Sequence, residues 1–198
     1  MDYSRLKKYI INKLQQELPK ELYYHQVEHS IQVAKDAETI GKAEGVSEHE
    51  LLLLKTAGLL HDSGFLQTPF QNEPIGSEIA KKILPDYAYT PKEIEIISKM
   101  ILSTAIPQQA KNLLEKIICD ADLCYLGEKD AKTHADNLRI EMELTSACKF
   151  TNLEWIDFQL KFLKSHEFFT DYARKHIAPG KTKYIKALLD EKQVLEGE

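Results

Sequence analysis

One signal for the start of a helix occurs three times in this chain. In each case a Ser or Thr is followed three residues later by a Glu, and an apolar residue flanks these four residues on either side. In such a capping box the hydroxyl and the carboxylate accept hydrogen bonds from backbone N–H groups that a helix start leaves without partners. The signals predict helices at about 47–61, 90–103 and 151–165. The pairs are Ser47 with Glu50, Thr90 with Glu93 and Thr151 with Glu154.

The rest of the chain also follows a helical pattern. Apolar residues recur three or four positions apart, no segment alternates apolar and polar residues for the length of a strand, and Gly and Pro number only 8 and 7. We therefore predict an all-α fold, a single compact multi-helix bundle with additional C-terminal helices. Further helices are expected at about 4–18, 24–44, 73–84, 108–126, 129–147, 168–176 and 182–194, with Pro179–Gly180 as the break before the last one.

Charge and cysteine content limit the partners and the compartment. The chain has 26 basic and 31 acidic residues, a net charge of −5, so no basic excess favours duplex nucleic acid. No apolar run is long enough for a membrane span. The N-terminus lacks a signal peptide, and three cysteines form no C-x-x-C pair. We expect a cytoplasmic protein that binds neither duplex nucleic acid nor a membrane; its oligomeric state stays open, a homodimer included.

The polar doublet His61–Asp62 follows a strongly apolar segment, residues 51–60. Burying an imidazole and a carboxylate costs free energy unless another group pairs with them. A divalent cation is one such partner, because both side chains are metal ligands and a mixed nitrogen and oxygen set suits Zn, Mn or Fe.

Two further polar clusters are candidates to join this doublet. His25 and His29 are four residues apart and are expected to share one helix face. Asp120 and Asp122 lie late in an apolar helix, where the helix dipole disfavours negative charge. Each cluster alone also fits a surface or core residue with satisfied hydrogen bonds. Together they favour a shared cation as the common cause.

These three stretches resemble the H…HD…D motifs of the HD-domain metal-dependent phosphohydrolases, in the branch of uncharacterised bacterial HD hydrolases. Residues 24–30 are similar to the first motif of that family, residues 59–64 to the second and residues 120–127 to the third. The resemblance spans about residues 20–130, and the helices of about 130–198 resemble the C-terminal helices of the same proteins. It implies one HD-type domain over residues 1–198.

The resemblance also implies roles for individual residues. It assigns one divalent ion, of Mn, Fe, Zn, Ni, Co or Mg, to His29, His61, Asp62 and Asp122. Asp122 is preferred to Asp120 because the ligand of the family follows the Ala, which leaves Asp120 as a supporting or capping group.

Three catalytic residues follow in the same way. Asp62 is catalytic as well as a ligand, and Glu73 would help to position the attacking water. His25 would protonate the leaving oxygen, or else orient the helix start. The implied activity is hydrolysis of a phosphoester of a nucleotide or a similar small phosphorylated metabolite by metal-activated water. Lys35 and Lys183 are candidate phosphate ligands.

The chain departs from the binuclear members of that family. Those members carry additional histidines where this sequence has residues 71–73 and 102–104, and neither stretch contains a His. The departure favours a single metal ion and argues against a binuclear cyclic-dinucleotide phosphodiesterase.

Two other functions are compatible with the sequence. Residues 25–29 fit H-x-x-E-H, the inverted zinc-peptidase motif, in which Glu28 would be the general base. That assignment leaves His61, Asp62 and Asp122 without a role. A metal-binding, nucleotide-sensing module without turnover is the second alternative.

Overall fold

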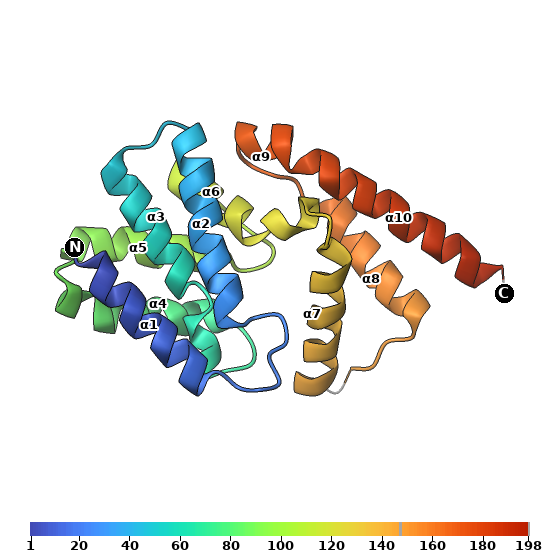
Figure 1. Cartoon of the computed structure of the whole chain (residues 1–198), viewed down its shortest axis with the longest axis horizontal. Coiled ribbons are helices and arrows are strands. Elements are labelled where there is room, and N and C mark those ends of the chain that lie inside the picture. Colours follow the sequence, from blue (N-terminus) through green and yellow to red (C-terminus); the bar gives the residue numbers. More distant parts are fainter. Residues whose placement is uncertain (147, 198) are drawn as a thin grey trace.

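The computed structural model describes residues 1–146 and 148–197, and within these residues all regular structure is helical. The prediction of an all-α chain is confirmed (Figure 1). In chain order the α-helices are α1 (Tyr3–Glu17), α2 (Val27–Ala43), α3 (Glu48–Leu60), α4 (Asn72–Ile83), α5 (Pro91–Ser103), α6 (Leu113–Asp122), α7 (Ala131–Thr145), α8 (Asn152–Ser165), α9 (Asp171–His176) and α10 (Ala178–Glu196), and the short 3₁₀ helices are η1 (Ser63–Leu66), η2 (Leu84–Tyr87) and η3 (Cys124–Gly127).

The three capping boxes form as the sequence predicts. The hydroxyls of Ser47, Thr90 and Thr151 accept hydrogen bonds from the backbone N–H three residues later. The carboxylate of each Glu in turn accepts a hydrogen bond from the backbone N–H of its cap residue. The helices α3, α5 and α8 therefore begin at the residues that these local hydrogen bonds predict.

Two predicted helix boundaries are wrong next to the polar clusters. The helix expected from residue 24 begins only at Val27, so His25 precedes α2 and does not share a helix face with His29. The helix expected over 108–126 is limited to α6, because the side chain of Asn112 caps its start by accepting from the N–H of Glu115. The chain then tightens into η3, so α6 ends at Asp122.

Two further differences concern the C-terminal third. Pro179 and Gly180 do not separate helices; they lie in the first turn of α10, where a proline needs no N–H donor. The preceding helix begins at Asp171 and is capped by the Thr170 side chain. The helix expected over 129–147 is observed as α7, and its predicted last residue, Ala147, lies outside the described residues.

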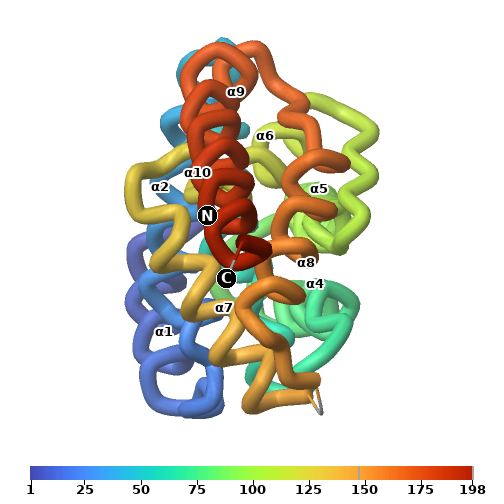
Figure 2. Tube along the Cα trace, turned by 90° about the vertical axis from the view of Figure 1, so that its right-hand side faces the viewer, coloured from blue at the N-terminus to red at the C-terminus, as the bar shows by residue number. Residues whose placement is uncertain are grey.

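The buried apolar side chains form two clusters. The larger one joins α1 to α6, and α3 approaches α2 closely because a Cβ at Gly58 would lie 2.7 Å from Ala34 Cα. The smaller one joins η3, α7, α8 and α10 around Trp155, Leu160 and Leu163. Figure 1 shows α7, α8 and α10 together on one side of the bundle, and Figure 2 shows α10 crossing in front of it.

Buried polar contacts connect these two clusters. The Asp120 carboxylate in α6 accepts hydrogen bonds from the N–H groups of Phe169 and Thr170 at 2.9 and 2.8 Å, and from the Thr170 hydroxyl at 2.7 Å. The Glu44 carboxylate accepts from the N–H of Tyr172 at 2.8 Å. These contacts support our proposal that residues 1–198 form one domain.

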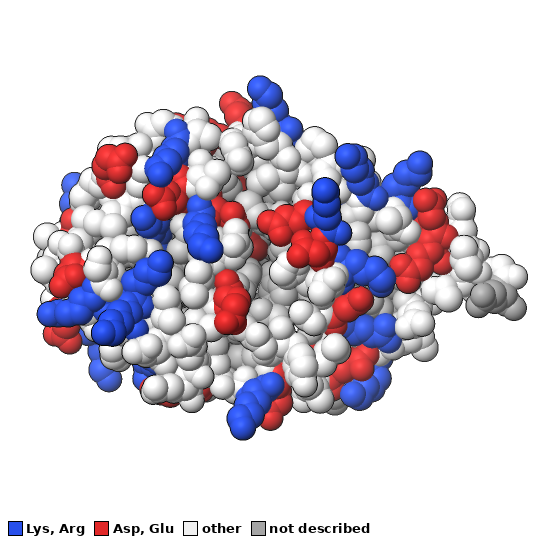
Figure 3. All heavy atoms as spheres, viewed as in Figure 1, with Lys and Arg blue, Asp and Glu red and all other residues white. Residues whose placement is uncertain are grey.

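The surface charge bears on binding to nucleic acid, and the length and apolar character of the helices bear on crossing a membrane. On the face shown in Figure 3, Lys and Arg alternate with Asp and Glu without a continuous basic field. No described helix combines the length and the apolar character that crossing a membrane requires.

Candidate metal centre

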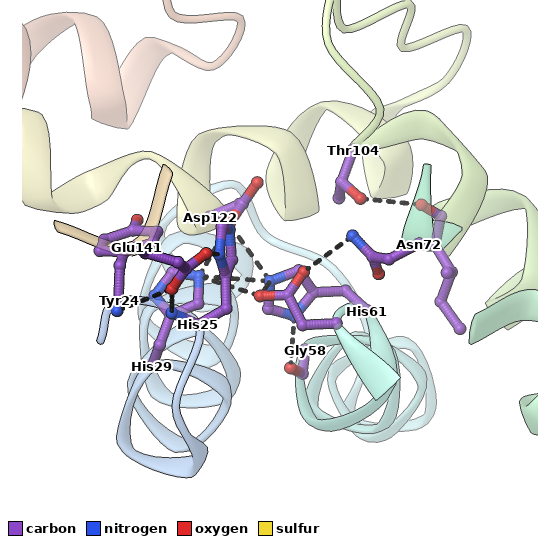
Figure 4. A network of polar contacts seen from close by, with 11 residues as sticks. Tyr24, His25, His29, Gly58, His61, Asn72, Thr104, Asp122 and Glu141 are labelled. Atoms are coloured by element: carbon purple, nitrogen blue, oxygen red, sulfur yellow. Dashed lines mark hydrogen bonds and ion pairs between the residues drawn. The ribbon is translucent and has the colours of Figure 1, made fainter. Parts of the chain in front are cut away.

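The ends of three helices converge on one point (Figure 4). His29 lies in the first turn of α2, His61 and Asp62 directly follow α3, and Asp122 is the last residue of α6. All four belong to the elements around the larger core, and the packing of α2, α3 and α6 sets their separation. Residues that are 93 positions apart, His29 and Asp122, thus come into hydrogen-bond contact.

Three ligand atoms, on His29, His61 and Asp122, form one compact group, and an oxygen of Asp62 lies against the two histidines. The distance from His29 Nε2 to Asp122 Oδ1 is 3.1 Å, and from His29 Nε2 to His61 Nε2 it is 3.3 Å. His61 Nε2 is 3.0 Å from Asp62 Oδ2 and 3.2 Å from Asp122 Oδ1. Asp62 Oδ2 is 3.5 Å from His29 Nε2. The structure therefore brings together all four residues that the resemblance assigns to the metal.

The hydrogen bonds around these atoms fit a bound cation. His61 Nδ1 lies 2.9 Å from the Gly58 carbonyl oxygen, which can only accept, so His61 Nδ1 carries a proton and Nε2 is the ring nitrogen that faces the cluster. Asp62 Oδ2 is buried and has no hydrogen-bond partner among the described residues. A buried carboxylate oxygen without a partner is costly, and a divalent ion would satisfy it.

The electrostatics of the cluster point the same way. Burial alone would lower the pKa of His61, but the carboxylates of Asp62 and Asp122 raise it well above its usual range. Burial would raise the pKa of each carboxyl, but His61 and the nearby histidines lower both below their usual range. Both acids are therefore ionised at neutral pH, and their negative charge stabilises a positive charge next to His61 Nε2.

Glu141 is a site residue that the sequence reasoning missed. This α7 carboxylate, 4% exposed, accepts from the backbone N–H groups of Tyr24 and His25 at 2.9 and 3.0 Å, and from His25 Nδ1. These bonds hold residues 24 and 25 outside α2, which explains the wrong prediction of a shared helix face. Glu141 lies 116 residues from His25, and no local pattern in the sequence marks it.

The environment of His25 favours its protonated form. Burial lowers the pKa of His25, but the Asp62 charge and the hydrogen bond to Glu141 outweigh burial and raise it above its usual value. Since Glu141 engages Nδ1, Nε2 is the ring nitrogen left for a substrate.

Glu73 and Asn72 lie at the start of α4, next to the doublet. Asn72 Nδ2 is 3.5 Å from Asp62 Oδ1, and Glu73 is half-buried. The η1 segment passes very close to this helix start, since a Cβ at Gly64 would lie 1.9 Å from the Asn72 carbonyl oxygen. Only glycine fits at position 64, immediately after the polar doublet.

Asp120 does not join the cluster. Its side chain is fully buried and its two oxygens accept the three hydrogen bonds from Phe169 and Thr170 described above. It therefore anchors the segment before α9, while Asp122 faces the histidines.

The geometry does not fit the inverted zinc-peptidase motif. His25 precedes α2, its Nδ1 is engaged by Glu141, and its ring centre is 6.1 Å from that of His29. Glu28 is exposed. A peptidase centre of this type needs both histidines on one helix face with the Glu beside them.

A cavity of about 280 Å³ opens beside the cluster. Asp62, Asp122, His25 and Glu73 form part of its wall, so the predicted catalytic residues and two of the predicted ligands border one space. Lys35 and Lys183, the candidate phosphate ligands, do not line this cavity.

Comparison with known proteins agrees with this arrangement. The sequence profile of the HD domain family matches residues 27–125, which include all four candidate ligands. A crystal structure of a predicted HD superfamily hydrolase from an uncultured Thermotogales bacterium is similar in fold, with a TM-score of 0.63, 20% sequence identity, and coverage of 96% of this chain and 92% of that one. No curated protein matches the sequence significantly.

Proposed function

The chain belongs to the HD domain family, and we propose that it is a metal-dependent phosphohydrolase acting on a phosphoester of a nucleotide or a similar small phosphorylated metabolite. One observation carries the proposal. Ligand atoms of His29, His61 and Asp122 form one compact group beside a cavity, and Asp62 Oδ2, which lies against the two histidines, is buried without a hydrogen-bond partner among the described residues.

His29, His61 and Asp122 would hold a single divalent ion, with Asp62, which lies against both histidines, as the fourth ligand. When bound, such an ion acidifies water and offsets the charge of phosphoryl oxygens, which is the chemistry that phosphoester hydrolysis needs at neutral pH. The Gly58 carbonyl keeps the proton of His61 on Nδ1, so Nε2 is available as a ligand.

His25 would deliver a proton to the leaving oxygen. Its Nδ1–H is fixed by Glu141, whose carboxylate stabilises the imidazolium, and the ring borders the cavity. A positioned general acid of this kind typically contributes a factor of about 10²–10⁴ in rate. Glu73, on the same cavity wall, would accept a hydrogen bond from the attacking water and orient it.

Metal content and activity of matched variants test this proposal. Wild type, Asp62→Ala and a control, Asp190→Ala at an exposed position of α10, are analysed for bound metal and screened on phosphomonoesters and phosphodiesters with Mn, Ni, Co and Mg. We expect about one metal equivalent and phosphatase or phosphodiesterase activity in wild type and in the control, with both lost in Asp62→Ala.

Two outcomes would contradict the proposal. Bound metal without hydrolysis of any phosphoester would favour the sensing module instead. No metal in wild type after reconstitution would remove the metal centre altogether, and the four residues would then be a hydrogen-bonded polar cluster.

A further inference from the structure

The cavity beside the candidate metal centre has two chemically different walls. One wall carries the acids Asp62, Glu73 and Asp122. The other wall comes from α7, α8 and α10 of the smaller core and is apolar, with Leu138, Met142, Trp155, Phe158 and Phe162 among its members. A substrate that places its phosphoryl group at the acidic wall thus extends its remaining atoms along an aromatic and aliphatic surface.

Among the residues that the structure describes, no lysine or arginine lines this cavity. Its charged side chains are three acids and His25. Beyond the phosphoryl group next to the candidate metal site, a second or third phosphate would have no cationic partner among the described lining residues and would face apolar side chains. Such a placement of negative charge is strongly unfavourable, so the cavity disfavours nucleoside di- and triphosphates.

The apolar wall carries two stacked aromatic rings and more than one polar group. Trp155 Nε1 is buried and has no hydrogen-bond partner among the described residues. The rings of Trp155 and Phe158 are stacked with centres 5.3 Å apart and an angle of 17° between their planes. Gln159, 7% exposed, accepts a hydrogen bond from the Tyr184 hydroxyl on Oε1, which leaves its NH₂ group as the donor it offers to the cavity.

The size of the cavity limits the organic group. An engineered cavity of about 150 Å³ is enough to bind benzene. The volume here, about 280 Å³, therefore accommodates a phosphoryl group together with one or two fused rings.

From these observations, and resting on the proposed function, we infer that the substrate is a phosphomonoester of an uncharged, flat, largely apolar alcohol that carries a hydrogen-bond acceptor. Water adds its oxygen to phosphorus, the bond from phosphorus to the alcohol oxygen breaks with its electron pair, and that oxygen takes a proton from His25. His25 recovers a proton from the attacking water, so the products are the free alcohol and inorganic phosphate.

Binding of the alcohol part can be measured without turnover, because Trp155 is the single tryptophan of the chain. The metal-free protein is titrated with 2-indanol and, in parallel, with glycerol, and the fluorescence of Trp155 is recorded. We expect a saturable change with 2-indanol and none with glycerol.

In a second experiment, the rates at which the metal-loaded protein hydrolyses 2-indanyl phosphate, glycerol phosphate and ATP are compared. We expect kcat/KM to be at least tenfold higher for 2-indanyl phosphate than for glycerol phosphate, and ATP to be the poorest. Phe158→Lys, at a lining position that is 42% exposed and tolerant of a polar side chain, should reduce the preference for the indanyl ester at least tenfold. Leu144→Lys on α7, 52% exposed and outside the cavity, should leave the preference unchanged.

The outcomes separate this inference from the proposed function. Hydrolysis of ATP or glycerol phosphate in preference to the indanyl ester, with no response of Trp155 to 2-indanol, overturns the inference alone. Saturable binding of 2-indanol without hydrolysis of these three esters or of any phosphoester in the screen described above overturns the proposed function, and the assignment of an ester substrate falls with it.

Discussion

Glu141 connects the C-terminal helices to the candidate general acid, and its replacement by Gln is the most informative single change. The Glu141 carboxylate is 4% exposed and makes three hydrogen bonds, two to backbone N–H groups and one to His25 Nδ1. Gln keeps the shape and one acceptor oxygen, but it removes the negative charge that stabilises the His25 imidazolium.

Two effects of different size follow from that geometry. Loss of one charge-assisted hydrogen bond lowers the free energy of unfolding by about 1.5–3 kcal/mol. A general acid contributes a factor of about 10²–10⁴, and Glu141→Gln weakens that acid without deleting it, so we expect kcat to fall by about 10–100-fold on alkyl phosphates.

The dependence on the leaving group distinguishes a catalytic effect from simple destabilisation. An alkoxide needs a proton as it departs, whereas nitrophenolate leaves readily without one. We expect Glu141→Gln to slow alkyl phosphate hydrolysis strongly and p-nitrophenyl phosphate hydrolysis by less than about threefold, with metal content unchanged. Glu143→Gln is the matched control, because Glu143 lies on the same helix and bonds to Arg139 and the N–H of Phe150, not to His25.

A double-mutant cycle completes the test. In a His25→Gln background, Glu141→Gln should have no further effect on alkyl phosphate hydrolysis if it acts through the imidazole. Equal losses on alkyl and nitrophenyl substrates, or additive effects of the two changes, would refute the reasoning.

Three further predictions concern other parts of the structure. Asp122→Asn should abolish metal binding, measured by elemental analysis, and leave the protein folded. Asp120→Asn should retain the metal but lower the free energy of unfolding by about 2–4 kcal/mol, because Asp120 accepts three hydrogen bonds. The opposite pattern would reverse the assignment of the two acids. Burial and the Lys181 ammonium lower the pKa of His166 from 6.5 to about 4, so the unfolded chain binds a proton at this residue more readily than the folded chain does. The contribution of His166 to the free energy of unfolding should therefore be constant above about pH 6.5 and fall by about 1–3 kcal/mol toward pH 4. Urea unfolding of wild type and His166→Gln across this range checks the sign, and an unchanged slope in the variant would contradict it. Gly64→Ala should unfold or strongly destabilise the protein in thermal unfolding, because its Cβ would lie 1.9 Å from a backbone oxygen of α4; a melting temperature equal to that of wild type would show that the two segments can separate.

The sequence by itself determined the elements whose signals are local. The three capping boxes fixed the starts of α3, α5 and α8 because their hydrogen bonds join residues three positions apart. The helical periodicity fixed the fold class, since it depends only on neighbouring turns of one helix. Without such signals the boundaries were less accurate, and α6 was predicted too long at both ends.

The candidate metal ligands could be predicted from the sequence for a different reason. His61 and Asp62 follow an apolar segment, and polar groups at such a position need partners, so they stood out before any contact was known. Their match to the motifs of the HD family then pointed to His29 and to Asp122 rather than Asp120. The convergence of the four residues on one point required the packing of α2, α3 and α6.

Only the tertiary structure decided what surrounds those ligands. Glu141 holds His25 outside α2 from 116 residues away, and a carboxylate in an amphipathic helix carries no mark of such a partner. The cavity likewise lies between walls from two separate cores, and its acidic and apolar surfaces are distant in sequence. Local hydrogen bonding and periodicity can be read along one segment, but the surroundings of His25 and the cavity beside the candidate metal centre depend on long-range contacts that exist only once the two cores have packed.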